Sequence, residues 1–323
     1  MYKVFIDGSA GTTGLRIAER LSGRPGVALL SIPDAERKDV SARLGRIAEA
    51  DVTILCLPDD GAREIVRAVG AAGVDARIID CSTAHRTDRA WLYGLPEAVP
   101  HKETRRIANP GCHATGFILA VRPLVEAGLI EPGALLCAHS VTGYSGGGKA
   151  MIAQYEGVRG SDALLLEAPR QYGLSQQHKH LPEMLVYAGL SQPPVFSPIV
   201  ADFYAGMLVS VALPGAEPGR GAKVTPKAVQ RALAEYYAGC PLVHVRALGY
   251  DPEGGFLSAN AFERRDDAEL LVLGQGAVGP DGQARVTVVC RFDNLGKGAS
   301  GAAIQNMNLM LGLPETEGLV VAG

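Results

Sequence analysis

The chain has 323 residues, of which 47% are hydrophobic and 20% charged, a composition typical of folded proteins and unlike that of disordered chains. Its 31 Lys and Arg residues and 34 Asp and Glu residues give a formal net charge of −3 without a basic block, which argues against nucleic acid as a partner. The N-terminus enters a strand pattern directly and no run of 18 apolar residues follows, so neither a signal peptide nor a membrane span is predicted.

The six cysteines include no CxxC pair, and four of them lie in or beside apolar strand patterns. This usage is typical of reduced thiols and not of a disulfide framework. We therefore expect a cytoplasmic protein.

Short apolar runs alternate with amphipathic segments over the first 110 residues. Strands are predicted at residues 3–7, 27–32, 52–57, 76–80 and 105–108. Helices are predicted at residues 13–21, 40–48 and about 61–69. The alternation indicates an α/β fold that begins as a doubly wound, Rossmann-type parallel sheet.

From about residue 133 the strand patterns become longer and are broken by Gly and Pro, which indicates a mixed or antiparallel sheet. Strands are predicted at residues 134–139, 207–213 and 284–292, and a helix at 226–237 would cover one face. A last helix at 302–311 is apolar enough to pack on the first domain. We expect a nucleotide-binding domain of residues 1–112 plus 297–323 and a second, α+β domain of residues 113–296.

Directly after the first predicted strand, a glycine occurs at every third position and a helix begins. The run reads Gly8, Ser9, Ala10, Gly11, Thr12, Thr13 and Gly14. Such glycines permit a tight turn and a close approach of backbone N–H groups to a pyrophosphate at the helix N-terminus. The spacing GxxGxxG differs from the commonest fingerprint, GxGxxG, and the alternative is a turn without a ligand.

The end of the second predicted strand carries no acidic residue at its tip, where NAD enzymes usually bind the ribose hydroxyls. Arg37 and Lys38 follow closely. We therefore expect NADP as the cofactor, with Arg37 or Lys38 near the 2′-phosphate, or else two solvated surface charges.

Cys112 is predicted to lie at the start of a helix, because the strand at 105–108 runs through Pro110 and Gly111 into an apolar-periodic stretch. The positive end of a helix lowers the pKa of a thiol and makes thiolate available. Cys112 is thus a candidate nucleophile, against the usual alternative of a buried and inert cysteine.

The segment 178–183 holds the only cluster of histidines. If the segment is extended, His178 and His180 face the same way, and either can exchange a proton while Glu183 orients an imidazole. The alternative is a zinc site formed by these three residues. The other five histidines are isolated in sequence, and a structural role is expected for His85, His101, His113, His139 and His244.

Four motifs occur in an order that resembles the N-acetyl-gamma-glutamyl-phosphate reductases, and their shorter, type 2 class best. They are the glycine run, the Asn-Pro-Gly-Cys of residues 109–112, the His-Lys-His-Leu-Pro-Glu of 178–183, and the Lys-Gly-Ala-Ser-Gly of 297–301. Residues 82–88, 93–97 and 305–308 extend the resemblance over nearly the whole chain. The family is related to aspartate-semialdehyde and glyceraldehyde-3-phosphate dehydrogenases, with a Rossmann domain and a catalytic and oligomerisation domain.

The resemblance implies an oxidoreductase of arginine biosynthesis that uses NADPH to reduce an acyl phosphate, releasing inorganic phosphate. Cys112 would form a thioester, which accepts hydride and then releases a semialdehyde. A homodimer or homotetramer is implied. The alternatives are another acyl-phosphate reductase, such as aspartate-semialdehyde dehydrogenase, and a non-catalytic protein that senses NADP.

The resemblance also implies roles for individual residues. His180 would be the acid/base, with His178 as the alternative and Glu183 as the orienting carboxylate, and no metal is implied. The added cofactor-binding residues are Ser82, Lys297 and Gly298. Apart from the resemblance, Arg86 is a candidate for the substrate phosphate or carboxylate because it follows the fourth predicted strand, and the other candidate substrate-binding residues are Asn109, Ser145 and Gly146. The chain departs from the family at Thr12, usually aromatic, and at His113, usually Tyr, which makes His113 a rival for proton transfer.

Overall fold

The computed structural model describes residues 1–157, 163–213, 224–275 and 285–321. The chain forms two compact units. Unit 1 comprises Met1–Pro110 and Ala299–Leu319, and unit 2 comprises Gly111–Gly298 and Val320–Gly323. Cys112, Lys297 and Gly298 therefore belong to unit 2.

Unit 1 is built on a six-stranded sheet in the order β2-β1-β3-β4-β6-β5, in which every pair is parallel. The strands are β1 Tyr2–Asp7, β2 Val27–Leu30, β3 Val52–Leu55, β4 Ile78–Asp80, β5 Leu92–Tyr93 and β6 Arg106–Ala108. The helices are α1 Thr12–Leu21, the 3-10 turn η1 Asp34–Glu36, α2 Val40–Glu49, α3 Asp59–Ala71 and α9 Gly301–Met310. The doubly wound start predicted from the sequence is confirmed.

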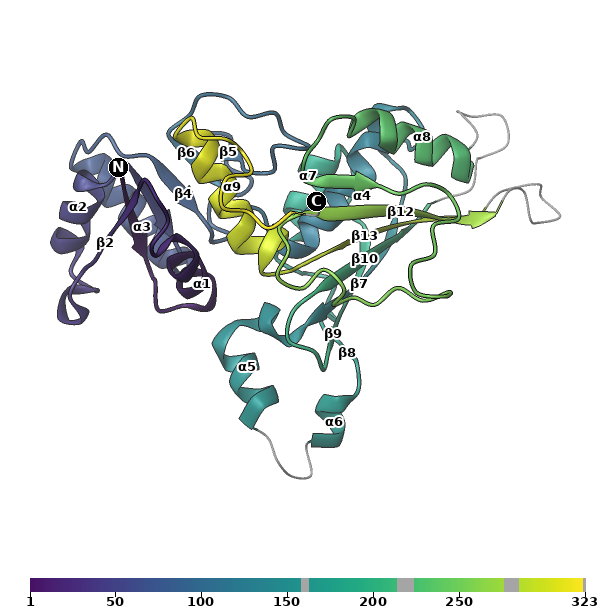
Figure 1. Cartoon of the computed structure of the whole chain (residues 1–323), viewed down its shortest axis with the longest axis horizontal. Coiled ribbons are helices and arrows are strands. Elements are labelled where there is room, and N and C mark those ends of the chain that lie inside the picture. Colours follow the sequence, from purple (N-terminus) through teal and green to yellow (C-terminus); the bar gives the residue numbers. More distant parts are fainter. Residues whose placement is uncertain (158–162, 214–223, 276–284, 322–323) are drawn as a thin grey trace. The chain divides into compact units, whose positions relative to one another are not determined.

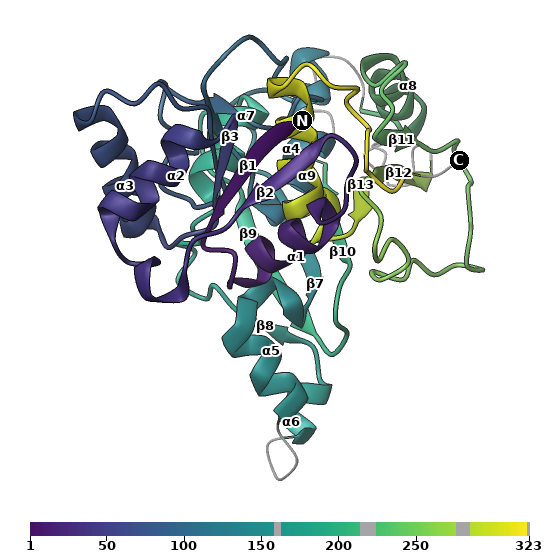
Figure 2. The ribbon, with the colours of Figure 1, turned by 60° about the vertical axis from the view of Figure 1, so that its left-hand side comes forward.

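Helices cover both faces of this sheet. Successive strand residues point to opposite sides, so neighbouring residues of β1 pack against different helices. Val4 and Ile6 of β1 pack in a cluster with residues of α1 and α9. Phe5, between them, packs in a second cluster with residues of α2 and α3. Figure 2 shows α2 and α3 on one side of β1 and α1 and α9 on the other.

Unit 2 contains a seven-stranded mixed sheet in the order β11-β12-β13-β10-β7-β9-β8 (Figure 1). The strands are β7 Cys137–Gly143, β8 Arg170–Gln171, β9 Val195–Ala201, β10 Met207–Ala212, β11 Val243–Val245, β12 Ala268–Gln275 and β13 Arg285–Phe292. The helical elements are α4 Cys112–Glu126, η2 Tyr144–Gly147, α5 Gly148–Gly157, α6 Ala163–Glu167, α7 Leu181–Ala188, α8 Pro226–Tyr236 and the π-helical turn η3 Gly296–Ser300. The prediction of a mixed sheet is confirmed.

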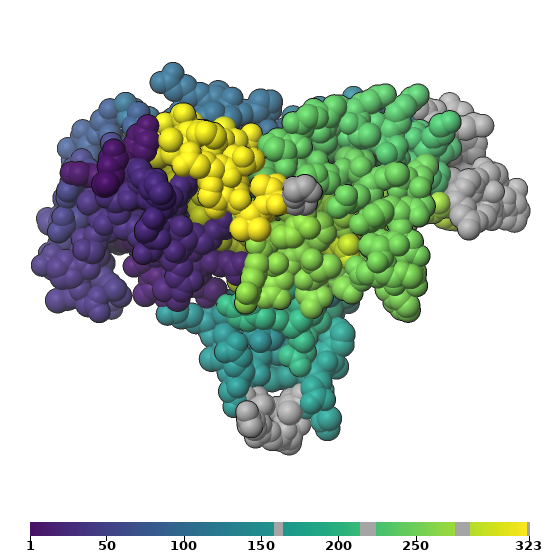
Figure 3. Space-filling view, in the orientation of Figure 1, coloured from purple at the N-terminus to yellow at the C-terminus, as the bar shows by residue number. Residues whose placement is uncertain are grey.

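Several predicted boundaries differ from the observed ones. The strand predicted at 134–139 begins at Cys137 and continues to Gly143, because residues 140–143 pair with β9 and β10. The predicted strand 284–292 is β13, and its first residue, Ala284, lies outside the described residues. The short helices α5, α6 and α7 were not predicted. α5 and α6 project from the sheet of unit 2 as a lobe (Figure 3).

Within the described ranges, none of the helices is both long and apolar enough to span a membrane.

Gly116 lets α4 approach the sheet of unit 2 closely. A Cβ atom built at this position would lie 2.6 Å from Val209 Cγ2 of β10 and 2.7 Å from Phe292 Cε1 of β13. Both distances are far shorter than van der Waals contact. The absence of a side chain therefore sets the position of α4, the helix that begins at Cys112.

We predict that Gly116→Ala destabilises the protein by about 1–3 kcal/mol, because overpacking outweighs the gain of about 1 kcal/mol in helix propensity. Gly45→Ala is the matched control, since Gly45 is also in a helix and a Cβ there meets nothing within 4 Å. It should stabilise by up to about 1 kcal/mol. Urea unfolding followed by circular dichroism measures both changes, and equal shifts in the two variants would contradict the packing argument.

Candidate active site

Cys112 is the first residue of α4, as the sequence predicted, and its side chain is partly exposed. The residue before it, Gly111, is the N-cap and contributes no side-chain cap. Instead, the Gly111 N–H donates a hydrogen bond of 3.0 Å to Oε2 of Glu183, which is 1% exposed. The thiol thus lies at the positive end of a 15-residue helix, where the dipole favours thiolate.

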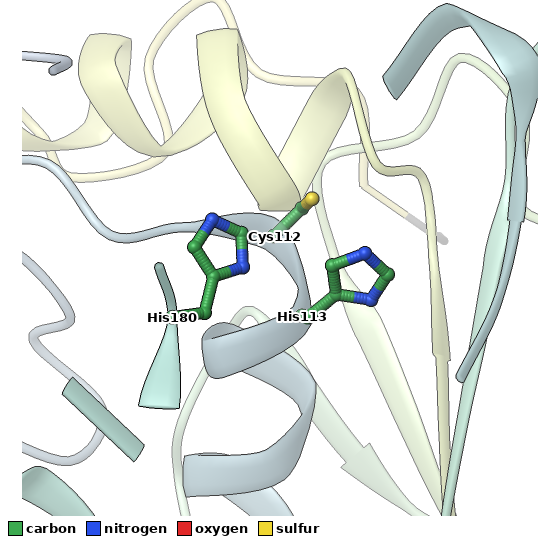
Figure 4. A group of neighbouring side chains, drawn as sticks. All are labelled: Cys112, His113 and His180. Carbon is green, nitrogen blue, oxygen red and sulfur yellow. The ribbon is translucent and has the colours of Figure 1, made fainter. Parts of the chain in front are cut away.

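Two imidazoles lie beside this sulfur. The Cys112 sulfur and one ring nitrogen each of His113 and His180 lie within 4.8 Å of one another. Figure 4 shows the two rings on either side of the Cys112 side chain. An acid/base group is therefore within reach of an acyl group bound to the sulfur.

The histidine segment is not extended, so the condition under which His178 and His180 would face the same way is not met. Lys179 and His180 form a turn, and His180 has helical φ and ψ angles of −88° and −10° directly before α7. Pro182, in the first turn of α7, favours helix initiation, and the His180 N–H donates a hydrogen bond of 3.2 Å to Nδ1 of His178. The two rings nevertheless meet edge to face, with centroids 4.7 Å apart.

Glu183 lies between the acid/base candidate and the start of α4. Its Oε1 is 3.9 Å from His180 Nε2, while its Oε2 accepts the hydrogen bond from Gly111. A buried carboxylate in this position would stabilise an imidazolium at His180.

His113 is part of this cluster, which its isolation in sequence did not indicate. Its Nδ1 lies 2.7 Å from Ser140 Oγ and its Nε2 lies 2.6 Å from the hydroxyl of Tyr172. Burial, reinforced by the charges of His178 and Lys179, lowers the pKa of His113 from 6.5 to about 3. The pKa of His178 is lowered to about 4, mainly by burial and secondly by Lys179.

Sequence reasoning missed Tyr172 and Ser140, and no motif signals either residue. Tyr172 is 59 positions from His113 along the chain. Burial raises the pKa of its hydroxyl, and the charge of Cys112 raises it further. Tyr172 is therefore a neutral phenol in contact with His113.

The turn before α9 lies against Cys112. A Cβ atom at Gly298 would be 2.8 Å from Cβ of Cys112 and 3.2 Å from Phe292, so the position tolerates only glycine without a local shift. Lys297 is fully buried beside it. Both residues are cofactor-binding candidates, and both lie in unit 2.

Ser145 and Gly146 lie in η2, directly after β7. Ser145 is buried, and its Oγ accepts a hydrogen bond of 3.1 Å from Asn294 Nδ2. Asn294 Oδ1 in turn accepts a hydrogen bond of 2.8 Å from the Gly206 N–H. The segment 140–149 is therefore the end of a strand followed by helical turns and tied to Asn294.

The glycine run in unit 1 forms a compact turn after β1. Gly8 has φ of +90°, and a Cβ there would lie 2.3 Å from the Cys56 carbonyl oxygen. A Cβ at Gly14 would lie 2.5 Å from the Gly8 carbonyl oxygen. The Gly11 N–H donates to this same oxygen at 3.0 Å, and α1 begins at the next residue, Thr12. The turn thus leads directly into a helix N-terminus, as an anion site requires.

The cationic candidates in unit 1 follow β2. Arg37 is 44% exposed and forms an ion pair of 2.7 Å with Asp34, and Lys38 is exposed beside it. Both charges are accessible to a ligand.

The remaining candidates lie at the carboxyl ends of β4 and β6. Ser82 donates to Asp80 through both its backbone N–H and its hydroxyl, at 2.9 and 2.8 Å. Arg86 is buried and donates to the carbonyl oxygen of Asn109 at 3.0 Å. Asn109 Nδ2 donates to the carbonyl oxygen of Ala299 at 3.1 Å. The structure therefore brings Arg86 and Asn109 together within unit 1.

We predict that His113 makes stability depend on pH. The folded imidazole takes up a proton only near pH 3, whereas the unfolded one does so near pH 6.5. His113 therefore lowers the free energy of unfolding as the pH falls below 6.5. At about pH 5 the loss from this residue is about 2 kcal/mol. Urea unfolding measured between pH 8 and pH 5 should show a loss of stability in His113→Gln that is smaller than in the native chain by about this amount, because His178, whose pKa is also lowered, contributes equally in both. The exposed His139→Gln is the control, and the same pH dependence in all three proteins would contradict the assignment.

The geometry can be compared with known proteins. Residues 3–105 match the model of the semialdehyde dehydrogenase NAD binding domain, and residues 112–294 match that of the semialdehyde dehydrogenase dimerisation domain. A computed comparison of folds finds similarity to a crystal structure of aspartate semialdehyde dehydrogenase with NADP from Candida albicans, with a TM-score of 0.66 and 16% identity over 96% of this chain and 98% of that one. At this identity, the likeness shows the fold alone.

Curated relatives are more similar in sequence. The chain is 45% identical over 315 residues to the N-acetyl-gamma-glutamyl-phosphate reductase of Sinorhizobium medicae, covering 96% of this chain and 98% of the relative. It is 42% identical over 331 residues to the N-acetyl-gamma-glutamyl-phosphate reductase 2 of a Nostoc species, covering 98% and 99%. The resemblance inferred from the motifs and the predicted fold class are both confirmed: the chain belongs to the semialdehyde dehydrogenase family.

Proposed function

We propose that this chain is an oxidoreductase that uses NADPH to convert N-acetyl-gamma-glutamyl phosphate into N-acetylglutamate semialdehyde and inorganic phosphate, a step of arginine biosynthesis. The observation that carries the proposal is the Cys112 sulfur at the start of α4, with ring nitrogens of His113 and His180 within 4.8 Å. The names of the relatives at 42–45% identity supply the substrate.

The glycine turn of unit 1 fits a dinucleotide. Side chains at Gly8 and Gly14 would collide with the turn's own backbone, so the chain there is bare and close to the start of α1. We assign the pyrophosphate to residues 8–14 and the 2′-phosphate to Arg37 and Lys38, with Ser82, Lys297 and Gly298 as further cofactor contacts. NADPH, when bound, supplies the hydride that reduces the enzyme-bound acyl group.

The first chemical step belongs to Cys112. Its thiolate attacks the γ-acyl carbon of the substrate, the carbon–sulfur bond forms, and the bond to phosphate breaks, so that inorganic phosphate leaves. A thioester remains on the sulfur, and it is more electrophilic than a carboxylate. The partial exposure of Cys112 admits the substrate, and the N-terminus of α4 stabilises the attacking charge.

The proton transfers belong to His180. It donates a proton to the oxygen that gains negative charge on reduction, and it removes that proton when the thiohemiacetal collapses and frees the thiolate. We prefer His180 to His178 because a ring nitrogen of His180 lies within 4.8 Å of the Cys112 sulfur and because Glu183 lies 3.9 Å from its Nε2. His178 is already an acceptor of the His180 backbone N–H.

The substrate-binding proposals are Arg86, Asn109, Ser145 and Gly146. Arg86 and Asn109 offer a guanidinium and an amide suited to a carboxylate or a phosphate. Ser145 and Gly146 lie in a helical turn tied to Asn294.

We propose that the enzyme is a homodimer or homotetramer that assembles through the sheet of unit 2. One face of this sheet lies against α4, since Val209 faces Gly116. The opposite face carries exposed side chains on several strands, among them Cys137, His139, Val195 and Leu273. The match to a dimerisation domain supports this arrangement. The six free thiols suit the reducing cytoplasm.

We predict that Cys112→Ser lowers turnover by several orders of magnitude, because a hydroxyl at this position is not ionised and forms no thioester. The affinity for NADP⁺ should be unchanged, because the glycine turn is intact. The assay is NADP⁺ reduction with phosphate and N-acetylglutamate semialdehyde, and Cys137→Ser, an exposed cysteine on β7, is the control. Unchanged turnover in Cys112→Ser would rule out covalent catalysis. A clear preference for aspartate semialdehyde would overturn the substrate assignment.

The same assay tests the zinc alternative for His178, His180 and Glu183. The proposed mechanism needs no metal, so prolonged chelation should leave turnover unchanged. Loss of activity on chelation that zinc restores would favour the metal site instead.

We predict that removing both charges in Arg37→Ala/Lys38→Ala weakens NADP⁺ binding by about tenfold or more and changes NAD⁺ binding little, because only NADP⁺ carries a 2′-phosphate. Isothermal titration with each nucleotide measures this. Arg46→Ala on α2 removes a comparably exposed cation, one paired with Glu49, and should change neither affinity. Equal weakening for both nucleotides would argue against these two residues as the 2′-phosphate site.

A further inference from the structure

A hydrogen-bonded chain of three side chains lies beside the nucleophile, and the covalent mechanism does not account for it. Ser140 lies on β7, His113 on α4, and Tyr172 directly after β8. His113 connects the other two, with contacts of 2.7 Å to Ser140 Oγ and 2.6 Å to the Tyr172 hydroxyl.

The fold fixes each member of this chain. Ser140 pairs with Val209 of β10, so both side chains point to the face of the sheet that α4 covers. Tyr172 is anchored by a backbone hydrogen bond of 3.0 Å from its N–H to the Pro198 carbonyl oxygen of β9. His113 is 2% exposed, and its ring is also packed edge to face against Phe196, with centroids 5.3 Å apart. The imidazole therefore has one orientation.

His113 is unsuited to be the acid/base of the reaction. Burial keeps the ring neutral, with a pKa of about 3, and both nitrogens already have partners. A neutral imidazole has one N–H donor and one acceptor nitrogen. One of its two neighbours must therefore donate a hydrogen bond to the ring, and the ring must donate one to the other neighbour.

The negative charge of the Cys112 thiolate decides which of Ser140 and Tyr172 donates its proton to His113. If Ser140 donates to Nδ1, the Nε2–H of His113 donates to the Tyr172 oxygen, and the Tyr172 O–H proton is left to point into the site. The Tyr172 hydroxyl lies 2.6 Å from Nε2 of His113, and a ring nitrogen of His113 lies within 4.8 Å of the Cys112 sulfur. Burial raises the pKa of Tyr172, and the charge of Cys112 raises it further, so the phenol is protonated. A protonated phenol beside a thiolate gains most by donating to the sulfur. In the alternative arrangement, the Tyr172 O–H donates to Nε2 of His113 and is not available to the sulfur.

We propose that His113 is a positioning residue which, held by Ser140, fixes the Tyr172 hydroxyl as a hydrogen-bond donor to the Cys112 sulfur and so stabilises the thiolate. Tyr172 then acts on the reacting atom, and His113 acts through it. The inference rests on the proposed function only in taking the Cys112 thiolate as the nucleophile.

Other charged and titratable groups lie on the segments around Cys112. They are His178, Lys179, His180 and Glu183 of the histidine segment and α7, and Lys297 of the turn that holds Gly298. The test therefore compares variants that leave all of these in place.

The test measures the thiolate directly, through the rate of Cys112 alkylation by iodoacetamide as a function of pH, located by peptide mass spectrometry. Tyr172→Phe should raise the apparent pKa of Cys112 by about one unit, which slows alkylation about tenfold at a pH below it. His113→Phe should produce the same shift although it leaves the tyrosine in place. The double variant should shift no further than either single one, because the two residues act as a unit.

Two conservative variants test positioning. In His113→Gln, the amide nitrogen takes the place of Nε2 and should restore most of the native profile. Ser140→Ala should shift the pKa of Cys112 in the same direction as Tyr172→Phe, and it keeps the inference testable if His113→Phe does not fold. Tyr237→Phe is the matched control, because the Tyr237 hydroxyl donates to the Leu119 carbonyl oxygen of the same helix α4 without reaching Cys112. It should leave the profile unchanged.

An unchanged profile in Tyr172→Phe overturns the proposal, and so does a shift in His113→Phe that Tyr172→Phe lacks, since His113 would then act directly. Alkylation needs neither substrate nor cofactor. A failed reductase assay with a shifted profile would therefore contradict the proposed substrate alone, whereas full turnover with an unshifted profile would contradict only the role of Tyr172.

Discussion

The hydrogen bond from the Gly111 N–H to Glu183 is the interaction on which the site depends. It joins the start of α4, and with it Cys112, to the first turn of α7, and both partners are buried. The same carboxylate lies 3.9 Å from His180 Nε2. One side chain therefore fixes the nucleophile's helix, holds the acid/base candidate near the sulfur, and supplies the charge that a protonated imidazole needs.

In the proposed arrangement, neutral groups as well as charges support the ionisation of Cys112. Burial lowers the pKa of His113 to about 3 and that of His178 to about 4, so neither ring is an imidazolium at neutral pH. A thiolate beside them gains no ion pair from either. What remains on this side is the N-terminus of α4 and hydrogen-bond donors such as the Tyr172 hydroxyl.

Local patterns were enough to predict the first unit and the position of Cys112 at the start of a helix. The alternation of buried strands and amphipathic helices predicted the parallel sheet, and Pro110 and Gly111 predicted a helix that starts at Cys112. The conformation of the histidine segment was left open by the sequence; in the structure Pro182 lies in the first turn of α7 and the His180 N–H donates back to His178. Tyr172 lies in no motif, and only the pairing of β8 with β9 brings it to His113, 59 positions away. Contacts of that kind depend on strand register and cannot be inferred from spacing along the chain.

Two glycines allow the close packing that positions Cys112. At Gly116 the helix packs on β10 and β13 with no room for a Cβ, and at Gly298, in the turn before α9, a Cβ would lie only 2.8 Å from Cβ of Cys112. The first sets how closely α4 lies on the sheet, and the second sets how closely a backbone passes the sulfur. Since a displacement of about 1 Å can cost a factor of about 100 in rate, substitutions at these glycines would impair catalysis without touching any reacting group. A requirement for glycine at such positions therefore reflects catalytic geometry as much as folding.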